Sequence, residues 1–156
     1  MPSKNDKNLY WDIITRQKDL FNKKEQLKIK NSKITVIGCG GSGGATVEML
    51  ARMGVENLSI MDKDSFDTSN LNRQLMSSFD DIGKSKVYVT RDRILSINPQ
   101  MNVDAFDGEL NHENVKSILE GSDVVIDALD NLISRILVSR HAFKLNIPFI
   151  HEIGRA

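Results

Sequence analysis

The sequence has little cysteine, no excess of charge of either sign and no long apolar run. Cys39 is the only cysteine in 156 residues. This excludes an internal disulfide and a zinc site built from several cysteines, so we expect no zinc. Lysine plus arginine and aspartate plus glutamate number 21 each, and zero net charge gives no sign of nucleic acid or a membrane surface as a partner. Without a bilayer-spanning run or an apolar signal core at the N-terminus, the sequence favours a soluble cytoplasmic protein.

The sequence does contain a regular alternation of strand-like and helical segments from residue 33 onward. We expect strands at 33–37, 57–61, 101–106, 123–127 and 148–151, with helices at 41–53, 83–97, 111–119 and 131–145. The expected fold class is therefore α/β: a Rossmann-like parallel sheet with flanking helices and a nucleotide at the carboxyl ends of the strands. Residues 1–30 are expected to form an N-terminal helical extension, and residues 31–156 the Rossmann-like domain. In the helix at 41–53, Ala45, Met49 and Met53 are expected to share the buried face.

A glycine-rich loop follows the first expected strand, with the sequence Gly38-Cys39-Gly40-Gly41-Ser42-Gly43. It matches G-x-G-x-x-G between a strand and a helix, the context in which this pattern binds nucleotides. Gly38 allows the tight turn, Gly40 lets a phosphate or ribose approach the backbone, and Gly43 lets the helix pack against the strand. The free N–H groups at the start of the helix then face an anion. We interpret Cys39 as a small loop or core residue rather than a nucleophile.

An acidic residue that binds ribose hydroxyls is expected about 20 residues after such a loop. Asp62 ends the second expected strand, 19 residues after Gly43, and Asp64 follows two residues later. These features predict nucleotide binding, and NAD is one ligand that fits them. The alternative is a glycine-rich turn that binds no ligand.

Cationic and carboxylate residues after the later strands favour ATP over NAD. Arg73 lies in a polar run at 69–74, Lys86 lies near the start of the next helix, and Asp130 follows the fourth strand. Arginine binds phosphate oxygens with two N–H groups, lysine adds a point charge, and magnesium prefers carboxylate and phosphate oxygens. This combination predicts ATP with magnesium. We expect Asp130 to hold the magnesium and Asp127 to be a buried structural carboxylate; the reverse assignment is the alternative.

These residues together resemble the signature of the ThiF/MoeB/HesA family, which includes the adenylylating domains of ubiquitin-activating-type enzymes. The signature combines a G-x-G-G-x-G loop, an Asp-x-Asp after the second strand, an S-N-L-x-R-Q segment, a G-x-x-K-V segment and an Asp-Asn pair. This chain has them in order at 38–43, 62–64, 69–74, 83–87 and 130–131. Upstream, Thr15-Arg16-Gln17 resembles the family's N-terminal R-Q segment.

The resemblance implies ATP-dependent adenylylation of the C-terminal carboxylate of a ubiquitin-like or sulfur-carrier protein with a Gly-Gly tail. The products are an acyl-adenylate and pyrophosphate. The implied roles are ribose binding by Asp62 and Asp64, phosphate contacts by Asn70, Arg73, Gln74 and Lys86 over the cradle of Gly38, Gly40, Gly41 and Gly43, and magnesium binding by Asp130 beside Asn131. The resemblance also implies a homodimer, in which Arg16 of one protomer's N-terminal extension completes the phosphate site of the other.

The chain departs from the family because it lacks the two C-x-x-C pairs and the later cysteine of many members. The C-terminal part of the family domain is also absent, which favours a truncated chain. Two other functions stay open: an NAD-dependent Rossmann oxidoreductase and a non-catalytic partner subunit of an activating enzyme. The acceptor within the family could also be an RNA base or a peptide end. Arg135 fits an ion pair and a phosphate contact equally well, and His112, His141 and His151 show no metal-ligand pattern.

Overall fold

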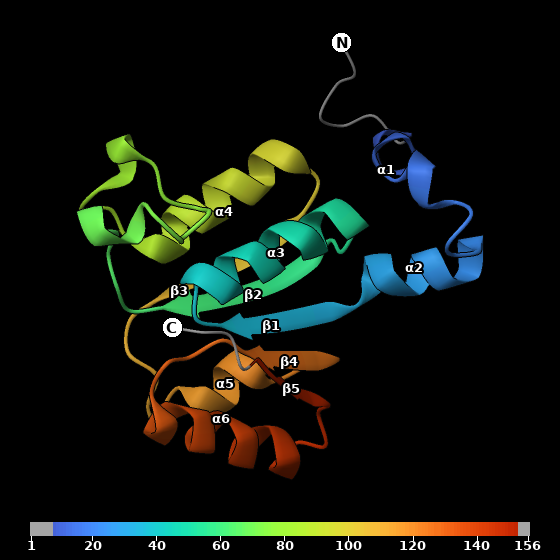
Figure 1. The fold of residues 1–156 in the computed structure, drawn as a ribbon. Coiled ribbons are helices and arrows are strands. Elements are labelled where there is room, and N and C mark those ends of the chain that lie inside the picture. The colour runs from blue at the N-terminus through green and yellow to red at the C-terminus, as the bar shows by residue number, and fades with distance from the viewer. Residues whose placement is uncertain (1–7, 153–156) are drawn as a thin grey trace.

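Five parallel strands form one sheet in the order β3-β2-β1-β4-β5 (Figure 1). The structure is a computed structural model that describes residues 8–152, so residues 1–7 and 153–156 of the two expected regions lie outside it. The strands are β1 (Lys33–Ile37), β2 (Asn57–Asp62), β3 (Asn102–Asp107), β4 (Val124–Asp127) and β5 (Phe149–His151). The helices are α1 (Leu9–Ile13), α2 (Lys23–Asn31), α3 (Gly41–Met53), α4 (Lys86–Ile97), α5 (Val115–Leu119) and α6 (Leu132–Lys144), with short 3-10 turns η1 (Thr15–Gln17), η2 (Thr68–Asn70) and η3 (Phe79–Asp81). The expected α/β Rossmann-like class is confirmed.

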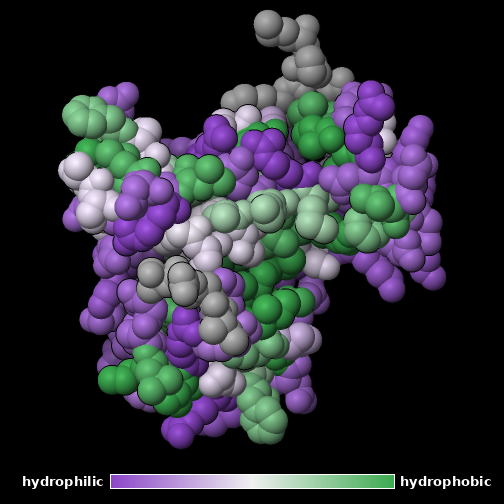
Figure 2. Space-filling model, in the orientation of Figure 1, coloured by the Kyte–Doolittle hydropathy of each residue, from purple (hydrophilic) through white to green (hydrophobic). Residues whose placement is uncertain are grey.

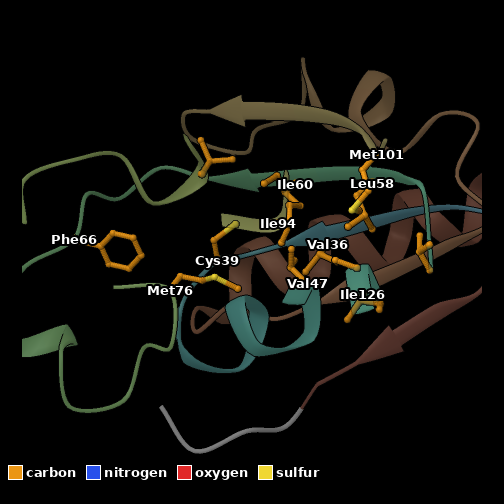
Figure 3. Packing of buried hydrophobic residues seen from close by; sticks show 13 residues of the cluster. Val36, Cys39, Val47, Leu58, Ile60, Phe66, Met76, Ile94, Met101 and Ile126 are labelled. Carbon is orange, nitrogen blue, oxygen red and sulfur yellow. The ribbon is translucent and has the colours of Figure 1, made fainter. Parts of the chain in front are cut away.

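Helices cover both faces of the sheet, and the three central strands β1, β2 and β4 are mostly buried. One face packs against α3 and α4, and the other against α5 and α6 (Figure 1). On the first face, Val47 and Ile94 from the two helices meet Val36 and Ile60 of the central strands (Figure 3). Burial on both faces explains why β4 begins with three consecutive apolar residues, Val124 to Ile126, rather than alternating apolar and polar ones. None of the described helices is long and apolar enough to cross a bilayer.

The strand order places a switch in chain direction between β1 and β4. After β1 the chain moves outward through β2 and β3, then returns to pair β4 with the other edge of β1. The loops that leave the carboxyl ends of these two adjacent strands therefore diverge to opposite faces of the sheet. A crevice opens at such a point, and open parallel sheets bind their ligands there.

The buried face of α3 differs from the expected one. Met49 is 65% exposed and Met53 is 38% exposed, so the expectation that they face the core is wrong. The buried face has small residues instead, among them Gly43, Val47 and Ala51. Small side chains let α3 lie close to the sheet, whereas the methionines point away from it. Exposed apolar side chains also lie on α6, and Figure 2 shows green areas over both helices.

Helix α4 begins at Lys86 rather than at the expected Gly83. Gly83 has a φ of +84°, a left-handed conformation that cannot start a right-handed helix. Ser85 forms an antiparallel bridge with Ser65, which keeps its backbone extended. The residues between β2 and α4 are therefore held as an ordered loop that returns to the end of the sheet.

The N-terminal segment is attached to the C-terminal end of α3. Tyr10 is 1% exposed, and its hydroxyl donates a hydrogen bond to the carbonyl of Gly54 at 3.0 Å. The side-chain amides of Gln26 and Gln17 donate to the carbonyls of Met53 and Arg52 at 3.0 and 2.9 Å. These bonds satisfy carbonyl groups that the end of a helix leaves unpaired.

Candidate functional site

A cleft of about 340 Å³ lies at the carboxyl ends of the strands. Residues that the sequence singled out contribute much of its lining, namely Gly38, Gly40, Gly41, Asp62, Asp64, Arg73, Gln74, Lys86, Asp130 and Asn131. The sequence analysis did not assign Lys63, Gly108, Glu109, Leu110, Ala128, Leu129, Ser134 or Glu152, which also line it. These come from the ends of β2, β3, β4 and β5 and from the start of α6, so topology brings them together.

The glycine loop packs against the end of β4 and leaves its other side open to the cleft. A Cβ on Gly43 would lie 1.9 Å from the carbonyl oxygen of Gly38, and one on Gly38 would lie 2.7 Å from the carbonyl oxygen of Ala128. By contrast, the nearest atom to a Cβ on Gly40 or Gly41 would be 3.9 or 3.5 Å away. Gly43 therefore serves packing, and Gly40 and Gly41 form the open cradle.

Helix α3 starts in this cradle without a capping side chain. Gly40 occupies the N-cap position and has no side chain to accept a hydrogen bond from the first turn. The N–H groups of that turn have no partner within the helix, and the helix dipole adds a partial positive charge. An anion such as a phosphate group fits this end of α3.

Asp62 is joined directly to the loop. Its Oδ2 accepts the backbone N–H of Cys39 at 2.7 Å, and its Oδ1 accepts the backbone N–H of Asp64 at 2.8 Å. Burial raises the pKa of the Asp62 carboxyl above its usual value, and the two backbone hydrogen bonds oppose this shift. The carboxylate is thus fixed beside the glycine loop, with lone pairs left to accept hydroxyl groups.

Two cationic side chains reach the cleft from the loop after β2 and from α4. Lys86 is 6% exposed, and its Nζ lies 3.2 Å from Oδ2 of Asp64. Arg73 is exposed, and its Nη1 donates to the carbonyl of Ser69 at 2.8 Å and to Oδ1 of Asn72 at 3.1 Å. Within residues 8–152, Arg73 forms no ion pair, so its charge is not compensated by a direct carboxylate partner.

Besides Gly43, two of the residues expected at the phosphates do not line the cleft. Asn70 is buried, and its Oδ1 accepts the backbone N–H of Asp67 at 3.1 Å, which closes the turn η2. Its visible role is to shape the loop that carries Arg73. Arg16 is exposed on η1, near the opposite end of α3 from the glycine loop. Gln74 does line the cleft, and its buried Oε1 has no hydrogen-bond partner among the described residues.

The two aspartates after β4 have different surroundings. Asp127 is fully buried and accepts the backbone N–H of Leu129 at 3.0 Å, so it has the structural position expected for it. Asp130 is exposed at the cleft wall, where it is available to a cation. Among residues 8–152, no group of three or more His, Cys, Asp or Glu side chains is arranged to hold a metal by itself. One carboxylate completed by phosphate oxygens is a set that suits magnesium.

The Asp127 carboxylate also begins a chain of hydrogen bonds that the sequence analysis missed. Nδ1 of His151 lies 2.7 Å from Oδ2 of Asp127, and Nε2 of His151 lies 2.7 Å from Nη1 of Arg135. Nε of Arg135 donates to the carbonyl of Leu129 at 2.5 Å. The pairing of Asp127 with His151 follows from the register of β4 and β5. Both residues end a strand, and only the strand order reveals that those strands are neighbours.

Cys39 is fully buried below the loop, as expected for a core residue, with its side chain directed into the cluster beneath α3 (Figure 3). Burial, with a smaller contribution from the nearby Asp62 charge, raises the pKa of the thiol far above its usual value. A thiol in this position is not a nucleophile, since the thiolate is the reactive form.

The glycine loop at the switch point of a parallel sheet defines the class of this protein: a Rossmann-like α/β domain of the kind that binds nucleotides. The chain belongs to the ThiF family, whose family model matches residues 14–154.

Relatives and solved structures agree with this assignment. The chain is 39% identical over 121 residues to the probable molybdopterin-synthase adenylyltransferase of Porphyra purpurea, covering 78% of this chain and 32% of that protein. It is 34% identical over 125 residues to the sulfur carrier protein adenylyltransferase of Thermus thermophilus, covering 80% of this chain and 46% of that protein. The ATP complex of the E. coli tRNA N6-threonylcarbamoyladenosine dehydratase superposes with a TM-score of 0.89 at 28% identity, covering 92% of this chain and 60% of that one. The chain thus spans about a third to a half of the length of these two curated relatives.

Proposed function

We propose that this chain is the nucleotide-binding part of an ATP-dependent adenylyltransferase that activates a carboxylate. The observation that supports this most is a single cleft lined by the open glycine cradle, the fixed Asp62 carboxylate, the cations Arg73 and Lys86, and Asp130. Binding the phosphates of a nicotinamide cofactor does not require two cations and a free carboxylate. The retention of these residues also argues against a non-catalytic partner subunit.

The walls of the cleft suggest how ATP lies in it. The phosphates sit at the start of α3, where Gly40 and Gly41 leave room and the helix N–H groups are free. The ribose hydroxyls donate to Asp62. Leu110 and Leu129 form an apolar part of the lining against which a base can pack.

The charge of the cleft supports a need for magnesium. Four cationic and five carboxylate side chains line it, so its formal charge is negative by one. A triphosphate adds further negative charge, which disfavours binding of the free anion. Magnesium, held by Asp130 and phosphate oxygens, would neutralise part of this charge when bound.

The reaction is an in-line displacement at the α-phosphorus. A carboxylate oxygen of the acceptor forms a bond to the α-phosphorus, the bond from that phosphorus to the bridging oxygen of the β-phosphate breaks, and pyrophosphate leaves with the electron pair. The product is an acyl-adenylate. Arg73 and Lys86 hold the phosphates in line and stabilise the negative charge that builds up on their oxygens.

The acceptor we favour is the C-terminal carboxylate of a sulfur-carrier or ubiquitin-like protein with a Gly-Gly tail. The name of the Thermus relative, a sulfur carrier protein adenylyltransferase, supports this kind of partner, and sulfur transfer is the associated process. ATP of the cytoplasm would supply the reaction, which is consistent with a cytoplasmic protein.

A second acceptor is a modified base in tRNA. The E. coli tRNA N6-threonylcarbamoyladenosine dehydratase superposes on 92% of this chain with a TM-score of 0.89. The threonyl part of such a base carries a carboxylate, so the same activation chemistry applies to it. This acceptor would reverse the expectation that no nucleic acid is a partner.

Arg16 fits the site only if a second protomer supplies it, because it lies outside the cleft of its own chain. We therefore propose a homodimer in which Arg16 of each protomer reaches the phosphates bound by the other. Mixing Arg16→Ala with Arg73→Ala protein tests this. Each mixed dimer has one site with both arginines, so pyrophosphate exchange should reappear in the mixture. No recovery after subunit exchange would rule out the shared site.

Calorimetric binding of ATP with magnesium, compared with NAD, tests the function itself. We expect ATP to bind and NAD not to bind, with ATP binding weakened by Arg73→Ala. ATP-dependent pyrophosphate exchange with a sulfur-carrier protein, and separately with tRNA bearing threonylcarbamoyladenosine, then identifies the acceptor. Tight NAD binding that ignores Arg73→Ala would reject the proposal in favour of an oxidoreductase.

A further inference from the structure

We propose that Arg135 binds a phosphate group of the nucleotide, and that Asp127 and His151 are positioning residues that hold it in place. The inference rests on the proposed function, and it assigns a role to a buried carboxylate and a histidine that the adenylylation chemistry leaves unused.

The hydrogen-bond partners fix the protonation of His151. Asp127 has only acceptor atoms to offer, so Nδ1 of His151 carries the proton and donates it. Arg135 has only donor atoms, so Nε2 of His151 must accept. The imidazole is therefore neutral, and one buried carboxylate orients it. A guanidinium that donates to an oriented ring nitrogen has a defined position rather than a range of rotamers.

The charge of Arg135 has no direct carboxylate partner. Its two visible contacts are the neutral His151 ring and the carbonyl of Leu129. No carboxylate oxygen within residues 8–152 lies within 4.0 Å of it, as the ion pairs of that region do not include it. These contacts occupy Nε and Nη1 and leave Nη2 without a hydrogen bond to the described residues. Arg135 is half-buried and lines the cleft, so an anion is the partner that would complete it.

The backbone places this guanidinium close to the glycine loop. A Cβ on Gly38 would lie 2.7 Å from the carbonyl oxygen of Ala128 and 3.4 Å from the backbone nitrogen of Leu129. The glycine loop thus contacts Ala128 and Leu129. The carbonyl of this same Leu129 accepts the hydrogen bond from Arg135. Arg73 and Lys86 reach the cleft from the β2 side of the loop. Arg135 enters from the β4 side, and all three cations line the cleft into which the first residues of α3 open.

Calorimetry with two ligands tests the proposal, because adenosine lacks the phosphates that Arg135 would bind. We expect Arg135→Ala to weaken ATP binding with magnesium by about 10- to 100-fold, the range for a hydrogen bond to a charged group, while adenosine binding stays unchanged. Arg135→Lys should recover only part of the loss, because a lysine has no fork to span two partners. The matched control is Arg140→Ala, which removes an exposed arginine of the same helix that does not line the cleft.

The positioning role has its own tests. His151→Ala should weaken ATP binding less than Arg135→Ala does, and it should add nothing in the double variant, since both changes remove the same interaction. The ¹⁵N signals of the His151 ring should show a protonated Nδ1 and an unprotonated Nε2. Additive losses, or the opposite tautomer, would remove Asp127 and His151 from the proposal.

Three outcomes separate this inference from the function on which it rests. If Arg73→Ala weakens ATP binding and Arg135→Ala does not, only the inference fails. If Arg135→Ala weakens ATP and adenosine equally, the arginine supports the fold rather than the phosphate, and the inference fails again. If the wild-type protein binds no ATP, the proposed function fails and the inference fails with it.

Discussion

Lys86 and Asp64 are joined twice: Nζ of Lys86 lies 3.2 Å from Oδ2 of Asp64, and the backbone N–H of Lys86 donates to the carbonyl of Asp64 at 2.9 Å. The second contact ties the start of α4 to the loop that follows β2. The first directs a buried lysine toward the cleft rather than along the helix. The fold thus provides a cation at the phosphate end of the site before any ligand arrives.

Removing either of the cations Lys86 and Arg73 should lower the rate of adenylylation strongly and the affinity for ATP less. We expect Lys86→Ala or Arg73→Ala to lower the rate of pyrophosphate exchange by about 10²–10³-fold, the usual cost of losing one donor to the transition state. Steady-state exchange with the acceptor protein measures this. Lys84→Ala is the matched control, because Lys84 is exposed, pairs with Asp81 at 3.0 Å and does not line the cleft. An equal loss in the control would indicate a general effect of charge.

Adenosine affinity should decline as the pH falls into the acidic range. Burial raises the pKa of Asp62, so its carboxylate takes up a proton at a higher pH than an exposed aspartate does, and the protonated form is a poorer acceptor for ribose hydroxyls. Adenosine avoids the titration of the phosphates. Calorimetry over a pH series should show the decline in wild type, whereas Asp62→Asn should bind weakly and with a flat profile.

The same raised pKa fixes the sign of the effect of Asp62 on folding. Between the usual pKa and the raised one, the folded state binds more protons than the unfolded state. The contribution of Asp62 to stability is therefore full at low pH and declines as the pH rises through that window. Urea unfolding of wild type and Asp62→Asn across that window measures the difference, and an opposite slope would contradict the assigned burial effect.

Gly43→Ala should destabilise the fold, because its Cβ would lie 1.9 Å from the carbonyl oxygen of Gly38. Overpacking of this kind typically costs about 1–3 kcal/mol, and more where backbone atoms must move. Gly41→Ala is the control, since its Cβ would have 3.5 Å to the nearest atom, and its stability should stay within about 0.5 kcal/mol of wild type. Urea unfolding distinguishes the two variants. Equal stabilities would mean that the start of α3 relaxes away from Gly38.

Cys39 should resist thiol reagents in the native protein. It is fully buried, and burial raises the pKa of its thiol, so neither access nor thiolate is available. Labelling followed by mass spectrometry should proceed only when denaturant opens the fold. Rapid labelling without denaturant would show that the glycine loop opens often.

Local sequence patterns predicted the central part of the fold, because adjacent patterns agreed on where one element ends and the next begins. The glycine loop marks both the end of β1 and the start of α3, and the structure has both where the sequence placed them. The face of α3 could not be read in the same way. Met49 and Met53 have helical spacing, but Gly43, Val47 and Ala51 share another face, and the close approach to the sheet decides between the two.

The residues of the candidate site also divide into those that sequence motifs predict and those whose role depends on the folded structure. Asp62, Arg73 and Lys86 follow recognisable motifs, so the sequence located them. Asn70 belongs to the same motif, yet its amide closes a turn, which depends on loop geometry that no pattern specifies. His151 had no signal at all, because its partner Asp127 lies 24 residues away and becomes its neighbour only through the pairing of β4 with β5.

Helix α3 has a different kind of contact at each of its two ends. Its first turn is the nucleotide cradle, and its last turn accepts hydrogen bonds from Tyr10, Gln17 and Gln26 of the N-terminal segment. With 13 residues, it spans about 20 Å between these ends. Helix α3 is thus a rigid connection between the two ends, and the segment that carries Arg16 is hydrogen-bonded to its C-terminal end. Any ligand that shifts the cradle along the helix axis must carry that segment with it.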